Sequence, residues 1–102
     1  YLGWNAKNLT LINCTIESLQ GMCYIENLVM KNCKLLNTNL AFEYSTVDAE
    51  ITSDIVSVLN PTSGIIRAAS IGELIMDKEK IDPSKTEIVC EKIGKVSDHL
   101  MV

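Results

Sequence analysis

The amino-acid sequence predicts an all-β solenoid, specifically the C-terminal coils of a single-stranded right-handed parallel β-helix. The heptad NLTLINC at residues 8–14 returns as NLVMKNC at residues 27–33, so the pattern repeats after 19 residues. Apolar residues recur at every second position within each copy, which is the period of a strand with one buried face. A fixed repeat of this kind is typical of a chain that coils so that each strand lies on the one before.

The strand-forming segment of each coil supplies the first buried face. At the 19-residue offset its inward positions form two strictly apolar columns. Equivalent residues of stacked strands lie about 4.8 Å apart, so each column packs like on like. An outward column places Lys31 beside Glu50, where we expect an exposed ion pair worth at most about 1 kcal/mol. The two inward columns are Leu9/Leu28/Val47 and Leu11/Met30/Ala49.

A second alternating segment precedes the first in each coil and predicts a second strand. On its outward side Tyr24 is expected beside Glu43. Because Trp4 is predicted to point inward, Tyr24 alone does not make a sugar-stacking platform. The inward columns of this segment are Trp4/Cys23/Phe42 and Ala6/Ile25/Tyr44.

Asparagine and cysteine mark the corner that follows the first strand. Asn13 is expected to lie over Asn32 in an amide ladder, and asparagine tolerates the left-handed backbone of a tight corner. Cys14 is expected to stack on Cys33 just past this corner. We interpret these thiols, together with Cys23 in its apolar column, as reduced core residues.

The fourth coil is predicted to be longer than the others. Aligning Val47 with Leu74 gives an offset of 27 residues, eight more than the repeat. The extra residues fall near residues 55–66, where Asn60-Pro61-Thr62-Ser63-Gly64 signals a turn. A last strand is predicted at Thr86–Cys90.

The pattern indicates one domain, with β-helix coils over residues 1–90 and a C-terminal tail or cap over residues 91–102. The sequence begins at Tyr1 without an initiator methionine and inside the repeat. A solenoid needs caps at its ends, and residues 1–8 do not resemble one. We therefore expect the chain to be the C-terminal part of a longer protein with further coils upstream.

A leucine-rich-repeat-like solenoid is the alternative fold. The string L-x-L-x-x-C-x-I at Leu9–Ile16 fits that template, and Leu28–Leu35 fits it as well. Two features argue for the β-helix instead. The offset of 19 residues is just below the usual leucine-rich repeat of about 20–29 residues, and the return half of each coil alternates like a strand.

Composition and charge narrow the function classes. The 102 residues are 47% hydrophobic, which argues against disorder and suffices for a modest core. The net charge is −4 and lysine and arginine are dispersed, so we expect neither a nucleic acid nor a membrane as partner. No apolar run approaches the roughly 18 residues of a membrane span. No signal peptide is visible, and we expect a cytoplasmic location.

The segments GWNAKNLTLINCTIESLQGMCYIENLVMKNCKLLNTNLAFEYSTVDAEI and SVLNPTSGIIRAASIGELIMD resemble a bacterial family catalogued only as a domain of unknown function. The similarity covers nearly all of residues 3–90. The resemblance implies a pectate-lyase-like right-handed β-helix and brings no established activity or catalytic residues. Some relatives are labelled hydrogenase, but iron–sulfur or nickel–iron ligation would require paired cysteines, and these cysteines are singly spaced.

Few residues in the sequence have the spacing expected of a catalytic or metal-binding site. Asp48 and Glu50 are outward carboxylates two positions apart, and β-helix enzymes use such residues for calcium or for acid–base work. We interpret both as solvated surface and keep them as the catalytic candidates. No metal site or cofactor is expected, because the single histidine, His99, and the cysteines lack ligand spacing. The cysteines are Cys14, Cys23, Cys33 and Cys90.

Two function classes follow from this pattern. The first is a non-enzymatic scaffold or binding surface for a glycan or a protein. The alternative is a fragment of a carbohydrate-active enzyme, with its site outside this segment or on the Asp48/Glu50 face. Exposed aromatic residues or a flat polar wall would favour the binding module, whereas clustered carboxylates with Arg or Lys beside a long cleft would favour the enzyme. Homo-oligomers are also expected, through an uncapped coil end or a strand edge.

Overall fold

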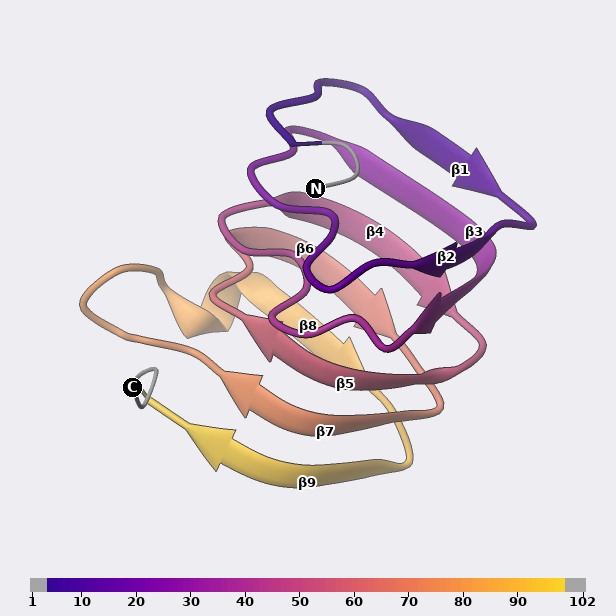
Figure 1. Cartoon of the computed structure of the whole chain (residues 1–102). Coiled ribbons are helices and arrows are strands. Elements are labelled where there is room, and N and C mark those ends of the chain that lie inside the picture. Colours follow the sequence, from indigo (N-terminus) through magenta and orange to yellow (C-terminus); the bar gives the residue numbers. More distant parts are fainter. Residues whose placement is uncertain (1–3, 99–102) are drawn as a thin grey trace.

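The computed structural model describes residues 4–98 and confirms the predicted fold class. Parallel strands coil into a β-solenoid whose successive coils are laid one upon the next (Figure 1). The N-terminal residues 1–3 and the C-terminal residues 99–102, which include His99, lie outside the described residues. The strands are β1 (Thr10–Ile12), β2 (Thr15–Glu17), β3 (Leu28–Leu36), β4 (Thr46–Ile51), β5 (Asp54–Leu59), β6 (Ser63–Arg67), β7 (Ser70–Ile75), β8 (Thr86–Val89) and β9 (Lys92–Ser97).

Two parallel sheets form the walls of the solenoid. One has the strand order β1-β3-β4-β6-β8, with β2 added alongside the C-terminal half of β3. The other has the order β5-β7-β9. The strands β1, β3, β4, β6 and β8 of the first, six-stranded sheet come from five successive coils (Figure 1). Because the return half of the later coils carries strands where a leucine-rich repeat would carry helices, the structure favours the β-helix over that alternative.

The 19-residue offset holds between the first three coils. Thr10 pairs with Val29, and Leu28 pairs with Val47. The inward side chains of Leu28 and Met30 are both 1% exposed, as the apolar columns require. The core of the solenoid therefore forms from the residues that the repeat places one above another.

The corner asparagines also lie as predicted. Asn13 and Asn32 have φ values of 57° and 52°, in the left-handed region, and Nδ2 of Asn32 donates to Oδ1 of Asn13 at 2.8 Å. Asn8 and Asn27 repeat the arrangement at the preceding corner, with φ values of 57° and 61° and a side-chain hydrogen bond of 2.9 Å. Each pair is an exposed two-rung amide ladder.

The prediction that Trp4, Cys23 and Phe42 share one buried column is wrong. Cys23 and Phe42 are buried, but Trp4 is 49% exposed. The second segment is also not a strand in the first coils, because left-handed residues occur there at alternate positions. In the second coil these are Met22 and Tyr24, and in the third they are Leu40, Phe42 and Tyr44.

The reason for the error is a one-residue change in coil length. The left-handed tyrosines Tyr24 and Tyr44 are 20 positions apart, whereas the strand residues Leu28 and Val47 that follow them are 19 apart. The third coil is thus one residue shorter between its tyrosine and its strand. Phe42 consequently occupies the place that Met22 has in the second coil, and both side chains are fully buried.

The later coils follow a different register from the predicted one. Val47 pairs with Gly64, which is 17 positions later and not 27, so the extra residues do not lie near residues 55–66. Leu74 pairs with Val58 of β5 instead of aligning with Val47. The longer coil is the last one, where Gly64 pairs with Thr86, 22 positions later.

The extra residues of the last coil form the loop between β7 and β8. This loop contains a short 3₁₀ helix, Pro83–Lys85, which the side chain of Asp82 caps. The predicted strand at Thr86–Cys90 appears as β8. The sheets continue beyond residue 90, because Lys92–Ser97 forms β9 and pairs with β7.

Serine hydroxyls complete the hydrogen bonding where coils of different length meet. The backbone N–H of Ile25 donates to Oγ of Ser45 at 3.0 Å, and that hydroxyl lies 3.0 Å from the carbonyl oxygen of Met22, to which it donates. The N–H of Leu35 donates to Oγ of Ser53 at 3.0 Å. These side chains take the place of main-chain groups that the shifted register removes from the ladder.

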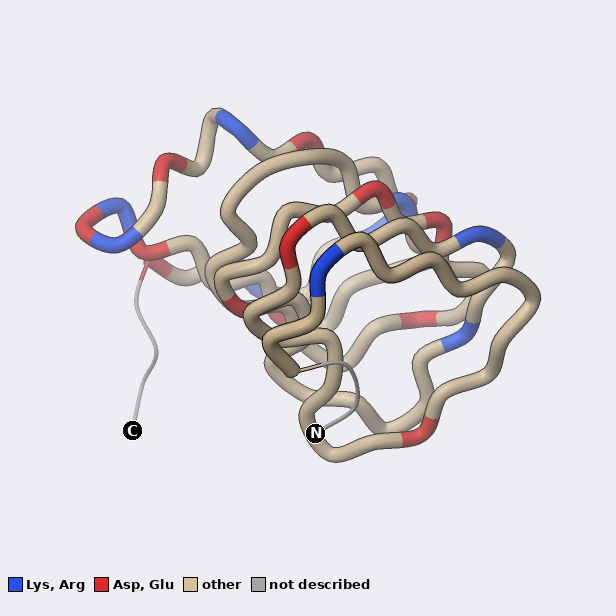
Figure 2. The backbone as a smooth tube through the Cα atoms, turned by 90° about the horizontal axis from the view of Figure 1, so that it is seen from above, with Lys and Arg blue, Asp and Glu red and all other residues tan. Residues whose placement is uncertain are grey.

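Charged residues are distributed around the outside of the coils. Figure 2 shows acidic and basic positions interspersed along the tube, with no side of residues 4–98 given over to one sign. Within that range no helix has the length and apolarity needed to cross a lipid bilayer.

Candidate functional site

Three aromatic side chains from successive coils form a stack on the surface. The ring centroids of Trp4 and Tyr24 are 5.7 Å apart with an interplanar angle of 17°, and those of Tyr24 and Tyr44 are 5.6 Å apart with an angle of 40°. Trp4 is 49% exposed and Tyr24 is 39% exposed, whereas Tyr44 is half-buried. We refer to Trp4, Tyr24 and Tyr44 as the aromatic stack.

The aromatic stack is the part of the surface that the predicted columns missed. The 19-residue offset assigned Tyr44 to the inward column below Ile25 and separated it from Tyr24. The local offset of 20 instead aligns Tyr24 with Tyr44, and both adopt left-handed backbone, with φ values of 56° and 49°. The detectable signal was the aromatic spacing itself, because Trp4, Tyr24 and Tyr44 follow one another at intervals of 20 residues.

A groove runs beside the aromatic stack and crosses four coils. Its volume is about 520 Å³. An ion pair lies along it, with Nζ of Lys7 and Oε2 of Glu26 3.7 Å apart. The lining therefore combines aromatic rings with hydroxyl, amide and charged groups. The groove is lined by Asn5, Ala6, Lys7, Tyr24, Ile25, Glu26, Tyr44, Thr46 and Thr62.

A second, smaller hollow also borders the stack. This small pocket has a volume of about 100 Å³ and is lined by Trp4, Gln20, Cys23, Tyr24 and Glu43. Nε2 of Gln20 donates a hydrogen bond to Oε1 of Glu43 at 3.2 Å. The Glu43 side chain is half-buried, so a carboxylate of fixed position faces a pocket with aromatic walls.

The electrostatics of the small pocket depend on Glu43. The negative charge of its carboxylate is the largest influence that raises the pKa of Tyr24 above its ordinary value, followed by desolvation. The phenol of Tyr24 is therefore protonated at neutral pH. Burial raises the pKa of the Cys23 thiol. Cys23 consequently stays neutral and is a poor nucleophile.

The two candidate carboxylates, Asp48 and Glu50, lie on the outward face of β4. Oδ1 of Asp48 is 3.6 Å from Nη1 of Arg67, and both side chains are exposed. Oε1 of Glu50 accepts a hydrogen bond of 3.1 Å from the backbone N–H of Asn32. The predicted Lys31–Glu50 ion pair is wrong, since neither residue forms an ion pair within 4.0 Å among the described residues. The register shift after Met30 separates their strand positions.

The thiols near the first corner contact main-chain carbonyls. Sγ of Cys14 lies 3.3 Å from the carbonyl oxygen of Ile12, and Sγ of Cys33 lies 3.4 Å from that of Leu11. All four cysteines are free. No group of three or more Cys, His, Asp or Glu side chains that could hold a metal ion occurs within residues 4–98.

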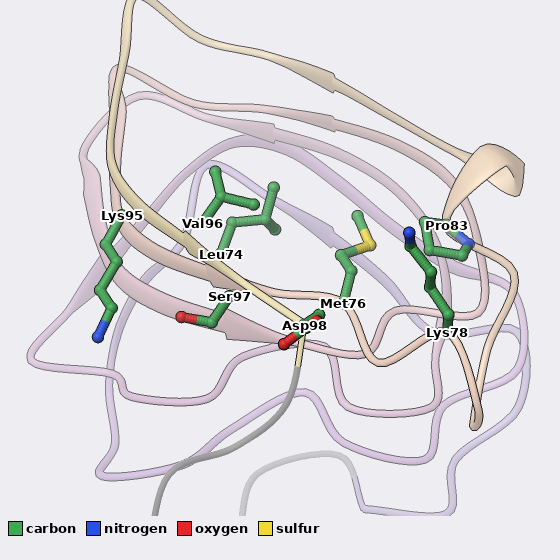
Figure 3. Close-up of a pocket in the computed structure, with 8 residues that line it drawn as sticks. All are labelled: Leu74, Met76, Lys78, Pro83, Lys95, Val96, Ser97 and Asp98. Carbon is green, nitrogen blue, oxygen red and sulfur yellow. The ribbon is translucent and has the colours of Figure 1, made fainter.

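A larger cavity lies at the last coil and has a volume of about 730 Å³. Figure 3 shows Lys78 and Lys95 on opposite sides of it, with Leu74, Met76 and Val96 between them. Leu74 and Met76 belong to the hydrophobic core of the solenoid. This cavity is therefore the open end of the core at the last coil, and Lys78, Lys95, Ser97 and Asp98 lie around it.

Comparison with known proteins identifies a family. The profile of a family described as "Protein of unknown function (DUF3737)" matches residues 1–89. Searches of curated proteins and of solved structures returned no match. The matched residues include the first four coils, β8, the aromatic stack and the groove. The chain therefore belongs to the DUF3737 family of proteins of unknown function.

Proposed function

We propose that this chain is a non-enzymatic binding module and that a glycan binds in the groove along the aromatic stack. The single observation that carries the proposal is the row of surface aromatic residues, Trp4, Tyr24 and Tyr44, in contact across three coils. Exposed aromatic rings offer a flat apolar surface against which a sugar ring can pack.

The chemistry of the groove suits a sugar. The C–H faces of a pyranose ring pack against aromatic side chains, and its hydroxyls need hydrogen-bonding groups at the rim. The groove supplies both, because the rings of Tyr24 and Tyr44 line it together with Asn5, Thr46 and Thr62. Four coils at about 4.8 Å per step give a length of roughly 14 Å. An extended oligosaccharide fits that length better than a single sugar does.

The alternative function is that of a carbohydrate-active enzyme using Asp48 and Glu50. Both carboxylates already have partners, since Asp48 is close to Arg67 and Glu50 accepts from the backbone of Asn32. They also lie on a strand of the six-stranded sheet, in a different segment of the coil from the aromatic stack. The binding module accounts for the aromatic stack and the enzyme does not.

The position of the single tryptophan provides the test. Trp4 is the only tryptophan in the chain, so its fluorescence reports directly on the aromatic stack. We expect oligosaccharides from a panel to change this fluorescence in a saturable way. Tyr24→Ala removes the central ring and should weaken binding about tenfold, since an aromatic contact contributes about 0.5–1.5 kcal/mol beyond the area buried.

The matched control is the double variant Asp48→Ala/Glu50→Ala. It should leave glycan binding unchanged if the groove is the site. Cleavage of a polysaccharide by the wild-type chain, lost in the double variant, would instead support the enzyme. Absence of any saturable response from Trp4 across the panel would contradict the proposed function.

A further inference from the structure

We propose that the small pocket binds an ammonium group, so that the glycan recognised by the groove contains an amino sugar with a free amine. This inference rests on the proposed function, because Tyr24 lines both the small pocket and the groove. It adds the chemical class of the ligand to the site described above.

The first argument is that the Glu43 carboxylate has no basic side chain beside it in the described part of the chain. One oxygen of its carboxylate accepts a hydrogen bond from the neutral amide of Gln20. Within residues 4–98 no lysine or arginine nitrogen lies within 4.0 Å of that carboxylate, whereas Glu26, Asp48 and Glu73 each have such a partner. A half-buried carboxylate without a cation attracts one from the ligand.

The second argument is the aromatic wall. Trp4 and Tyr24 line the same small pocket as Glu43. The negative potential of aromatic faces favours a cation nearby, and the carboxylate adds a charge-assisted hydrogen bond. A volume of about 100 Å³ admits only a small group such as an amine on its sugar carbon. Aromatic rings and a single carboxylate together define an ammonium site.

The third argument concerns the ligands that the small pocket disfavours. A ligand that covers the pocket removes the Glu43 carboxylate from water, which is unfavourable unless an opposite charge compensates. A neutral hydroxyl or acetamido group supplies a hydrogen bond but no charge. A uronic acid would place a second negative charge beside Glu43, in a chain whose net charge is already −4. The pocket therefore selects amino sugars over neutral and acidic sugars.

The experiment compares three tetrasaccharides of related shape. They are a β-1,4-linked glucosamine tetramer, its fully N-acetylated counterpart and a β-1,4-linked glucose tetramer, each titrated against the full chain with Trp4 fluorescence as the readout. We expect the glucosamine tetramer to bind about tenfold more tightly than the other two, as one charge-assisted hydrogen bond allows. Its affinity should fall with added salt, because the contact is ionic.

The decisive variant is Glu43→Gln, which keeps the side-chain shape and removes the charge. It should lower the affinity for the glucosamine tetramer about tenfold and leave the two neutral tetramers nearly unaffected. Glu87→Gln is the matched control, because it makes the same change in net charge at an exposed position on β8. It should not change the binding of any of the three tetramers.

The failures of the two proposals can be told apart. Equal binding of all three tetramers, unaffected by Glu43→Gln, would overturn the ammonium site and leave the glycan-binding groove in place. Equal losses in Glu43→Gln and Glu87→Gln would also overturn it, since the effect would then be one of net charge alone. No response of Trp4 to the glucosamine tetramer would overturn the ammonium site, and no response to any oligosaccharide of the panel would overturn both proposals.

Discussion

The asparagines at the corners combine a backbone preference with a side-chain contact. Asn13 and Asn32 both have left-handed backbone, which is unfavourable for most residues with a Cβ atom but tolerated by asparagine. Their amide side chains also form a hydrogen bond of 2.8 Å between coils. The sequence carried enough information for this feature, because the residue type and the offset both pointed to it.

Substitution of Asn32 separates these two contributions. Asn32→Ala loses the hydrogen bond and strains the backbone, so it should lower the free energy of unfolding by about 1–2 kcal/mol. Asn32→Gly loses only the hydrogen bond and should cost less, about 1 kcal/mol. Urea denaturation of the wild type and both variants measures the difference. Equal losses in the two variants would show that the left-handed backbone stores no strain.

The serine hydroxyls inside the coils were not predictable from the repeat. Ser45 is fully buried, and its Oγ accepts from the N–H of Ile25. Its role arises because the third coil is one residue shorter than the second, so a side chain completes the ladder. In the sequence this role is indicated only by a polar residue, Ser45, between Tyr44 and β4. The alternating pattern predicts nothing more than a corner at that position.

Ser45→Ala is expected to lower the free energy of unfolding by about 1–3 kcal/mol, because it leaves a buried N–H without its acceptor. Ser70→Ala is the control, since its hydroxyl donates to Asp54 at an exposed position, and its effect should stay within about 0.5 kcal/mol. Thermal and urea unfolding followed by circular dichroism measure both. A loss for Ser45→Ala no larger than that for Ser70→Ala would contradict the role assigned to the buried hydroxyl.

At the scale of elements, the register of the later coils shows where the periodic pattern misleads. Asn60 and Pro61 form the corner between β5 and β6, although their turn signal suggested an inserted loop. The alternating residues of β7 have the same spacing as those of β4. The apolar pattern therefore placed β7 next to β4, where the structure has β6. The pairing of Val47 with Gly64 depends on close backbone approach, which no apolar pattern reports.

Gly64 permits this approach. Its φ is +115°, and a Cβ atom built there would lie 1.8 Å from the carbonyl oxygen of Val47. Gly64→Ala should therefore destabilise the chain by about 3 kcal/mol or more through backbone strain and displacement of β4. Gly21→Ala, whose Cβ would lie 3.6 Å from Ser18, should change the free energy of unfolding by less than about 1 kcal/mol. Similar melting temperatures for the two variants would refute this account of Gly64.

At the scale of the whole molecule, the sequence was sufficient for the architecture and insufficient for the site. The parallel solenoid follows from apolar columns such as Leu28 over Val47, because stacking requires like residues at like positions. The aromatic stack depends on a one-residue change in coil length, and the small pocket depends on how Gln20 and Glu43 meet across coils. Such contacts depend on the local backbone geometry of each coil. A single average repeat length does not predict that geometry.

The strand edges at the last coil are the expected sites of self-association. In the described part of the chain β8 and β9 pair on one side only, and Val96 is 67% exposed. Unpaired parallel edges beside apolar side chains favour pairing between chains. We expect sedimentation at increasing concentration to show a dimer that Val96→Lys weakens. Val56→Lys changes an exposed valine in the third coil and should have no effect. A monomer at every concentration would contradict this expectation.

The order β1-β3-β4-β6-β8 has a consequence for how the molecule opens. A strand in the middle of a stack is released only after a neighbour has left, whereas a terminal strand separates by itself. Amide hydrogens of β4 should therefore exchange with deuterium most slowly, and those of β1 and β9 should exchange first. Trp4 belongs to the coil of β1, which should open first, and Tyr44 belongs to the coil of β4, which should open last. A ligand that bridges Trp4 and Tyr44 would therefore slow exchange in β1 without contacting that strand.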